Sequence, residues 1–292
     1  MPVLHRFIIG KSRNKMKNIL VPTDFSDNCN KAAKLAMEIA VLFNAEIHFL
    51  HQISTPVNWT KLTKTQEQNY PDTISEIGIA KSKLRELDRQ AEYKGLKSRT
   101  FLIFVTGENA IVGHSQDFRH DFIITGSKGI QNGFLKKLLG SNAQKIIRKA
   151  QVPILVVKED AVVFPFKNIV FVSDFKEDIS NAFNEVEKIA KRCKAKIHLL
   201  NINTTSDFNS VENGLQPIKE FLEHFPKLEN YAMHVYNEST VLGGIEKFEG
   251  SNDVDLIAMY THSRKGLANV FSKSIAENVT NHSKKPVMTV HL

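Results

Sequence analysis

The stretch KNILVPTDFSD, residues 17–27, recurs 150 residues later as KNIVFVSDFKE, residues 167–177, and this recurrence decides the fold. Three further pairs of segments match in the same order: AEIHFLHQI at 45–53 with AKIHLLNIN at 195–203, HDFIITGSKG at 120–129 with VDLIAMYTHSRKG at 254–266, and VPILVV at 152–157 with PVMTV at 286–290. Internal similarity of this kind indicates one architecture that the chain contains twice.

The repeat predicts two tandem domains, with a boundary in KEDAVVFPF, residues 158–166. We assign residues 16–160 to domain 1 and residues 165–292 to domain 2. Residues 1–15 carry four Lys or Arg and no acidic residue, and we expect them to form a disordered extension. Met16 is the alternative start of the chain.

Composition and charge exclude several classes of protein. Hydrophobic residues make up 42% and charged residues 24% of the 292 residues, which is typical of a globular protein. No apolar run approaches the roughly 18–20 residues of a membrane span. The net charge of +8 raises nucleic acid as a partner, but the lysines are spread along the chain, which favours a solvated surface. Cys29 and Cys193 have no cysteine nearby and predict reduced thiols of a cytoplasmic protein.

Within the first copy, short apolar segments alternate with segments of helical period. This alternation predicts right-handed crossovers and a mostly parallel sheet covered on both faces. The fold class is therefore α/β, with two tandem five-stranded sheets flanked by helices. In domain 1 we expect strands at 18–23, 46–53, 99–105, 121–125 and 153–158, helices at about 27–43, 77–91, 109–118 and 142–150, and a loop at 54–72.

Ligands of such sheets bind at the carboxyl ends of the strands, so GSKGIQNGFLKKLLGSNAQ, residues 126–144, is the first candidate site. Gly126 and Gly129 follow a predicted strand, and Gly140 with Ser141 opens a helix. Glycine lets the backbone approach an anion, and the N–H groups of a helix N-terminus attract phosphate. Ser141 also fits a helix N-cap, with SNAQ as a capping box, and the residues alone leave both interpretations open.

Two other strand ends carry polar groups. Asp24 follows Thr23 after the first strand, where its carboxylate can accept hydrogen bonds from a ribose or an adenine amine. The alternative is that Asp24 caps the first helix. Gln52 ends the second strand and can offer backbone groups to the edge of a base. No Walker sequence, GxGxxG, GxSxG or HExxH motif occurs, and nothing in the sequence predicts a catalytic residue or a metal site.

The segments NILVPTDFS, GSKG and GSNAQKIIRKAQVPILVV, in this order, resemble the universal stress protein family. The resemblance covers nearly the whole chain from Met16, as a tandem of two such domains. It implies an adenine-nucleotide α-hydrolase-like, Rossmann-like fold that binds ATP, with Mg²⁺ carried by the phosphates, or stays nucleotide-free. The family pattern is G-x2-G-x9-G-[ST], whereas this chain has ten residues between Gly129 and Gly140. The residues that the resemblance assigns to ATP are Thr23, Asp24, Gln52, Thr125, Gly126, Gly129, Gly140, Ser141 and Asn142.

The second copy departs from this pattern. Tyr260, Ser263 and Lys273 stand at its glycine positions, while Ser274 and Glu277 still spell a capping box, SIAE. A cap that persists without the glycines indicates that the glycines of domain 1 serve more than folding. Losing two hydrogen bonds to phosphate, each worth roughly 1.5–3 kcal/mol, weakens binding by about 100-fold or more. We therefore expect domain 2 to bind no ATP.

The resemblance, together with the glycines of domain 1, implies a cytoplasmic, ATP-binding protein of the stress response that regulates or protects and is not an enzyme. One alternative is a nucleotide-free tandem scaffold that acts through protein–protein contacts, and another is a slow ATPase or self-phosphorylating enzyme. The last strands of the two copies, PILVVK and PVMTVHL, would be open sheet edges, and pairing them would make an intramolecular pseudo-dimer. The identity of protein partners and a further homodimer are not predictable from these residues.

Overall fold

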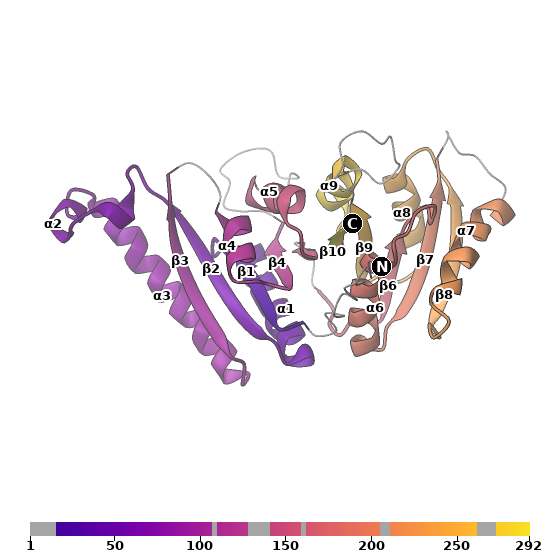
Figure 1. Ribbon diagram of the computed structural model, residues 1–292, viewed down its shortest axis with the longest axis horizontal. Helices are drawn as coiled ribbons and strands as arrows, with labels where there is room; N and C mark the ends of the chain where they lie inside the picture. Colours follow the sequence, from indigo (N-terminus) through magenta and orange to yellow (C-terminus); the bar gives the residue numbers. More distant parts are fainter. Residues whose placement is uncertain (1–15, 107–109, 128–140, 159–161, 205–210, 262–272) are drawn as a thin grey trace, which may run out of the picture.

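One ten-stranded sheet runs through both domains (Figure 1). The computed structural model describes residues 16–106, 110–127, 141–158, 162–204, 211–261 and 273–292. The strands are β1 (Asn18–Pro22), β2 (Glu46–Ser54), β3 (Ser98–Val105), β4 (Phe122–Gly126), β5 (Ile154–Val157), β6 (Asn168–Val172), β7 (Lys196–Asn203), β8 (Tyr231–Asn237), β9 (Leu256–Thr261) and β10 (Val287–His291).

The order of the strands is β3-β2-β1-β4-β5-β10-β9-β6-β7-β8. Within each copy all neighbouring strands are parallel, and the antiparallel pair β5–β10 joins the two copies. The predicted α/β class with two tandem five-stranded sheets is therefore confirmed. The predicted pseudo-dimer is confirmed as well, because Val156 of β5 lies opposite Val287 of β10.

Helices cover both faces of the sheet, as a parallel sheet requires. In domain 1, Ile111 and Ile146 pack with Leu20 and Ile123 on the face opposite to that covered by the first helix. The helices are α1 (Asp27–Phe43), α2 (Lys64–Glu67), α3 (Pro71–Tyr93), α4 (Ile111–Asp117), α5 (Ser141–Lys149), α6 (Ser180–Cys193), α7 (Val211–Glu223), α8 (Val241–Glu249) and α9 (Lys273–His282), with the 3-10 helix η1 (Trp59–Lys61).

Helix α1 has the bounds that the sequence predicts. Ser26 is its N-cap, because the side chain of Ser26 accepts the N–H of Cys29 at 3.4 Å. The apolar stripe that includes Ala32, Leu35 and Ile39 is buried against the sheet. Stripe and cap together explain why the segment after β1 is helical.

The predicted loop at 54–72 was wrong in part. This segment holds η1 and α2, and α3 begins within it at Pro71. Trp59 is only 7% exposed, because its ring packs against those of Tyr70 and Phe104. The excursion is therefore anchored to β3 by one aromatic side chain, which its polar composition concealed.

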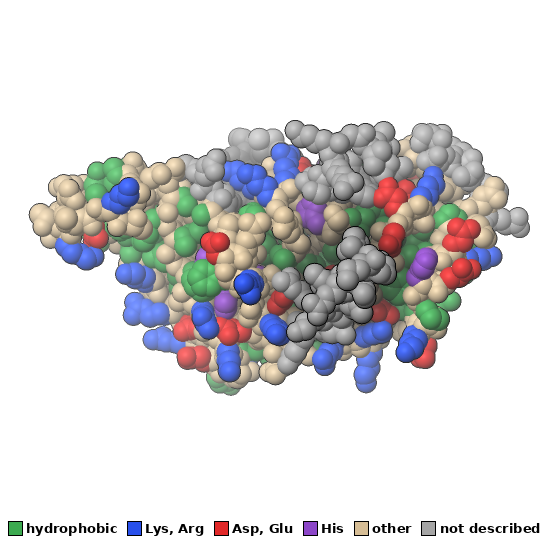
Figure 2. Space-filling view, in the orientation of Figure 1, with side chains coloured by type: hydrophobic (Ala, Val, Ile, Leu, Met, Phe, Trp, Pro, Cys, Tyr) green, Lys and Arg blue, Asp and Glu red, His purple; other side chains and the backbone are tan. Residues whose placement is uncertain are grey.

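Charged side chains of both signs lie on the face of the molecule shown in Figure 2, with Lys and Arg gathered along its lower edge and Asp and Glu among them. Ion pairs among the described residues include Lys94 with Glu38 at 2.6 Å and Arg99 with Glu46 at 2.6 Å. On this face the excess of positive charge is thus mixed with acidic residues.

The two copies differ most at the end of their fourth strands. The strand registers place Gly126 of β4 and Tyr260 of β9 at equivalent positions. A Cβ added to Gly126 would come within 2.7 Å of backbone atoms of Asn28 and Cys29, in the first turn of α1. Glycine is therefore required at this position for the close approach of α1 to β4.

In domain 2 the phenol of Tyr260 is buried at the equivalent position, and helix α6 begins later than α1 does. Helix α1 begins at Asp27, whereas α6 begins at Ser180, three residues after Glu177, the equivalent of Asp27. Tyr260 is 1% exposed, and its hydroxyl donates to Asp174 Oδ1 at 3.1 Å. Gly126 therefore has a packing role, and a further role in binding a ligand stays a prediction.

The predicted capping box SIAE stays a prediction. Helix α9 begins at Lys273, and the side chain of Ser274 lies outside the described residues. The carboxylate of Glu277 accepts from Arg148 Nε at 2.5 Å and from Arg148 Nη2 at 2.8 Å, across to α5. Helix α5 begins at Ser141, whose side chain lies outside the described residues, and its capping role stays a prediction.

We predict that Gly126→Ala destabilises the protein by about 1–3 kcal/mol, because the added methyl group meets backbone atoms that cannot rotate away. Gly78→Ala in α3 is the matched control, since a Cβ there meets nothing within 4 Å, and it should stabilise by up to about 1 kcal/mol. Urea denaturation of the two variants measures both effects. Equal stability of Gly126→Ala and wild type would contradict the close approach.

Candidate functional site

The turn after β1 is built from the side chains of Thr23 and Asp24. Thr23 Oγ1 accepts the N–H of Phe25 at 2.9 Å, and Asp24 Oδ1 accepts the N–H of Ser26 at 2.9 Å. Phe25 is left-handed, with φ of 64°. The alternative role of Asp24 as helix N-cap is therefore wrong, since Ser26 is the cap and Asp24 shapes the turn before it.

His51 of β2 holds this turn against the neighbouring strand. Its Nδ1 lies 2.7 Å from the carbonyl oxygen of Thr23, so that nitrogen carries the proton and donates it. The ring of His51 packs on the ring of Phe25 at a centroid distance of 4.5 Å. The ammonium of Lys83 also lies over the Phe25 ring, 5.2 Å from its centroid. No motif around His51, which stands directly before Gln52, predicts this contact.

Gln52 takes part in the site through both backbone and side chain. Thr23 N donates to the Leu50 carbonyl at 2.9 Å, so Leu50 faces β1, and Gln52, two residues further, directs its backbone groups to the same side. Strand β1 ends at Pro22, and these groups therefore lie beyond its end. The side-chain oxygen of Gln52 accepts the N–H of Ala110 at 3.1 Å, which fixes the start of α4.

The end of β4 completes the described part of the site. Thr125, Gly126 and Ser127 are all buried there, and Asn28 Nδ2 donates to Ser127 Oγ at 3.4 Å. Because β2, β1 and β4 are neighbours in the sheet, the predicted residues Thr23, Asp24, Gln52, Thr125 and Gly126 lie along one edge. Gly129 and Gly140 lie outside the described residues, as do the side chains of Ser141 and Asn142.

Domain 2 keeps the turn without the glycines. Ser173 Oγ accepts the N–H of Phe175 at 2.8 Å, Asp174 Oδ1 accepts the N–H of Lys176 at 3.4 Å, and φ of Phe175 is 56°. The repeated TDF and SDF tripeptides are therefore the sequence signal for this turn. Since the turn survives in both copies, its geometry alone does not distinguish a ligand site from a structural corner.

Cys29 lies beside the turn with a neutral thiol. Burial, with the Asp24 carboxylate as a second cause, raises the pKa of Cys29 to about 11. The thiol therefore stays protonated at neutral pH and is a poor nucleophile.

Buried histidines form a separate cluster in domain 1. His48 Nδ1 lies 2.8 Å from His120 Nε2, and His48 Nε2 lies 2.9 Å from Glu46 Oε1. Burial, assisted by His48, lowers the pKa of His120 to about 4, and burial lowers the pKa of His114. His48 and His120 thus have hydrogen-bond partners, whereas His114 Nε2 is a buried atom for which the described residues supply no partner.

Domain 2 contains a comparable pair. His198 Nδ1 lies 3.0 Å from His234 Nε2, and both rings pack on Phe248. Burial, with His234 as a second cause, lowers the pKa of His198 to about 4. Within the described ranges no group of three or more His, Cys, Asp or Glu side chains is arranged to hold a metal ion.

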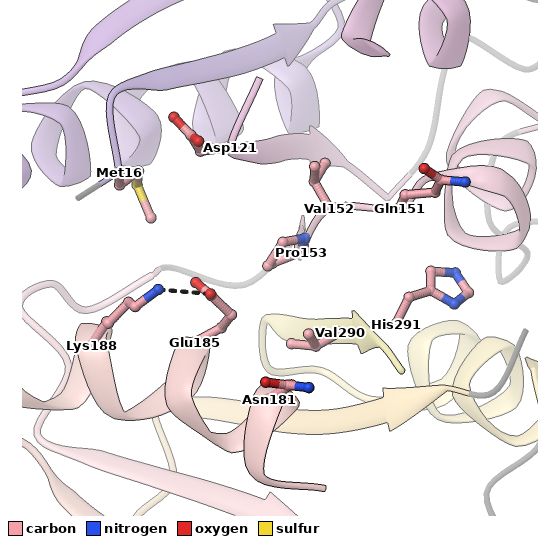
Figure 3. A pocket seen from close by; sticks show the side chains of 10 residues that line it. All are labelled: Met16, Asp121, Gln151, Val152, Pro153, Asn181, Glu185, Lys188, Val290 and His291. Atoms are coloured by element: carbon pink, nitrogen blue, oxygen red, sulfur yellow. Dashed lines mark hydrogen bonds and ion pairs between the residues drawn. The ribbon is translucent and has the colours of Figure 1, made fainter. Parts of the chain in front are cut away.

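A pocket between the two domains lies away from the candidate site (Figure 3). Asp121, which lines it, directly precedes β4, so this pocket is near the amino end of that strand. An ion pair of 2.7 Å between Lys188 and Glu185 forms part of its wall. Its lining residues are Met16, Asp121, Gln151, Val152, Pro153, Asn181, Glu185, Lys188, Val290 and His291, none of which was predicted to bind ATP.

In the part of the chain that the structure describes, no helix has both the length and the apolar character to cross a membrane.

Known proteins resemble this chain in both of its halves. The model described as the Universal stress protein family matches residues 15–158 and 165–291. Universal stress protein MJ0531 of Methanocaldococcus jannaschii is 31% identical over 152 residues, which cover 52% of this chain and 88% of that protein. A solved universal stress protein of Archaeoglobus fulgidus aligns with a TM-score of 0.72 and 22% identity over 94% of this chain and 98% of its own, which shows a common fold.

We predict that stability falls as the pH drops from about 6.5 toward 4. His120 and His198 have folded-state pKa values of about 4, below the ordinary value of 6.5, so the unfolded chain takes up protons first. Each histidine should lower the free energy of unfolding by about 2 kcal/mol at pH 5 relative to pH 7.5. Urea denaturation at pH 7.5 and pH 5 measures the loss.

The variant His120→Asn should lose its share of this pH dependence, whatever it does to stability at pH 7.5. His224→Gln, at an exposed position, is the control and should keep the full dependence. If His120→Asn and wild type lose equal stability between the two pH values, the assignment to His120 is wrong.

Proposed function

Because the chain belongs to the universal stress protein family, we propose that it binds ATP as a regulatory or protective protein of the cytoplasmic stress response. In this proposal the nucleotide occupies domain 1 only, and Mg²⁺ arrives with its phosphates. The observation that carries the proposal is the difference between Gly126 and Tyr260 at otherwise equivalent strand ends. Domain 1 keeps the family's glycines, whereas domain 2 fills the first of these positions with a phenol.

Three neighbouring strand ends of domain 1 supply groups that suit an adenine nucleotide. Asp24, after β1, presents a carboxylate that ribose hydroxyls can donate to, and the backbone of Gln52 faces the space beyond β1. Thr125 and Gly126 end β4, from which the chain leads to the start of α5 at Ser141. A helix N-terminus reached through glycines suits phosphate because its N–H groups carry partial positive charge.

In domain 2 the carboxylate that corresponds to Asp24 has a donor from its own domain. The hydroxyl of Tyr260 donates to Asp174, the equivalent of Asp24. Burial raises the pKa of Tyr260, with the Asp174 carboxylate as a further cause, so this hydroxyl keeps its proton and remains a donor. Asn201 Nδ2 donates to the Gly214 carbonyl at 2.9 Å, which ties α7 to the end of β7.

We propose binding without turnover as the activity. The bound nucleotide would change the surface that domain 1 presents to protein partners. The nucleotide-free scaffold remains the second candidate, since ten residues rather than nine separate Gly129 and Gly140.

We predict that millimolar Mg·ATP raises the melting temperature of the purified protein by several degrees. Ligand at 100 times its dissociation constant stabilises the folded state by about 2.7 kcal/mol. Denaturing the protein as purified, and analysing the released small molecules, tests the same point without added ligand. No thermal shift together with no released nucleotide would favour the scaffold and refute the proposal.

We predict that Asp24→Asn weakens ATP binding by about tenfold or more, because a hydrogen bond to a charged carboxylate contributes roughly 1.5–3 kcal/mol. Asparagine keeps the side-chain oxygen that accepts the N–H of Ser26, so the turn is preserved. Asp174→Asn makes the same change in domain 2 and should leave the affinity unchanged. Isothermal titration of both variants decides the matter, and equal losses would place nucleotide in both domains.

A further inference from the structure

Helix α5 of domain 1 is held by side chains of domain 2. The guanidinium of Arg148 makes two hydrogen bonds with the carboxylate of Glu277 on α9, at 2.5 and 2.8 Å. Helices α5 and α9 lie side by side at the centre of the molecule (Figure 1). A bidentate pair of this kind fixes direction as well as distance between two helices.

A second contact reaches the same end of α5. His291, the last residue of β10, has its Nε2 3.1 Å from the carbonyl oxygen of Ile147. Its Nδ1 lies 3.0 Å from Thr261 Oγ1 at the end of β9. A donor at the last carbonyls of a helix is stabilising, so domain 2 supplies α5 with a C-terminal cap.

Of these two contacts between the domains, one has a pseudo-symmetric counterpart and the other does not. An offset of 133 residues relates Ile147 to Thr280 and His291 to Lys158, and Lys158 Nζ donates to the Thr280 carbonyl of α9. The helix-end contact is therefore made in both directions. By the same offset the pair Arg148–Glu277 corresponds to Asn281 and Gln144, which carry no charge.

We infer that domain 2 is a positioning partner for the nucleotide site of domain 1, acting through the contacts of Glu277 and His291 with α5. The inference rests on the proposed function, because the N-terminus of α5 is where phosphate is expected. Helix α5 has nine residues, and so short a helix depends on tertiary contacts for its placement. Contacts at residues 147 and 148 therefore set the direction of the N–H groups at its other end.

The ion pair is tested by Glu277→Gln, which should weaken ATP binding by no more than about three- to fivefold, because Arg148 is largely exposed and water screens such a pair. The exchanged double variant, Arg148→Glu with Glu277→Arg, should restore the affinity to within about twofold. Glu238→Gln removes a comparable ion pair, with Lys247, remote from α5, and should leave the affinity unchanged. Failure of the exchange to restore binding would count against positioning.

The helix-end contact is tested by comparing His291→Ala with Lys158→Met. Each removes one of the two pseudo-symmetric hydrogen bonds, but only the first touches α5. His291→Ala should weaken ATP binding about threefold and speed the amide exchange of α5, whereas Lys158→Met should speed the exchange of α9 and leave the affinity unchanged. Equal effects of the two variants on affinity would mean that the junction only stabilises the molecule, and would overturn the inference.

Wild-type protein that binds no ATP would refute the proposed function itself. Wild-type protein that binds ATP, with Glu277→Gln and His291→Ala binding equally well, would refute only the positioning role.

Discussion

The antiparallel pairing of β5 with β10 is the constraint on which the rest of the structure depends. Each copy of the repeat ends in a strand that would leave a row of unpaired backbone groups, and such an edge invites aggregation. Pairing the two edges removes both and joins two parallel sheets into one. It also brings the last helix of each copy beside that of the other, so that α5 and α9 meet.

Within this frame, one position separates the two copies. At the end of β4 the absent side chain of Gly126 leaves room for the first turn of α1, and at the end of β9 the phenol of Tyr260 is buried where α6 has lost that turn. The same volume is therefore filled in two ways. In domain 1 the first turn of α1 fills it beside Gly126, and in domain 2 the side chain of Tyr260 fills it beside a shorter helix. The second also engages Asp174, so one substitution changes both the packing and the polar group that a nucleotide would need.

Hydrophobic periodicity and the internal repeat were sufficient to predict the fold. They did not predict local structure that depends on a single side-chain contact. The stripe of α1 and the capping Ser26 gave its bounds, and the repeat gave the tandem sheets. The composition of segment 54–72 predicts a loop because its polar residues conceal the burial of Trp59. The capping pattern at Ser274 gave no sign that the carboxylate of Glu277 pairs with Arg148, which is 129 residues away in the sequence.

The candidate site was predictable at its strand ends and not at its supports. Thr23, Asp24, Gln52 and Gly126 stand at the carboxyl ends of neighbouring strands, which topology alone brings together. The hydrogen bond from His51 to the Thr23 carbonyl connects β2 with the turn after β1, and no sequence spacing predicts it. Family resemblance assigns ligand contacts, while the side chains that hold those contacts in place belong to the individual chain.

A second copy without nucleotide, as we propose for domain 2, still has a structural role in the molecule. Its fifth strand covers the edge of β5, and its last helix and its penultimate residue contact α5, so removing it would expose backbone and release a helix end together. These contacts require a strand, a carboxylate at position 277 and a donor at position 291. None of them requires glycines after the fourth strand of domain 2. Selection for the junction and selection for the ligand therefore act on separate residues, and one copy can lose the ligand while the pair keeps its structure.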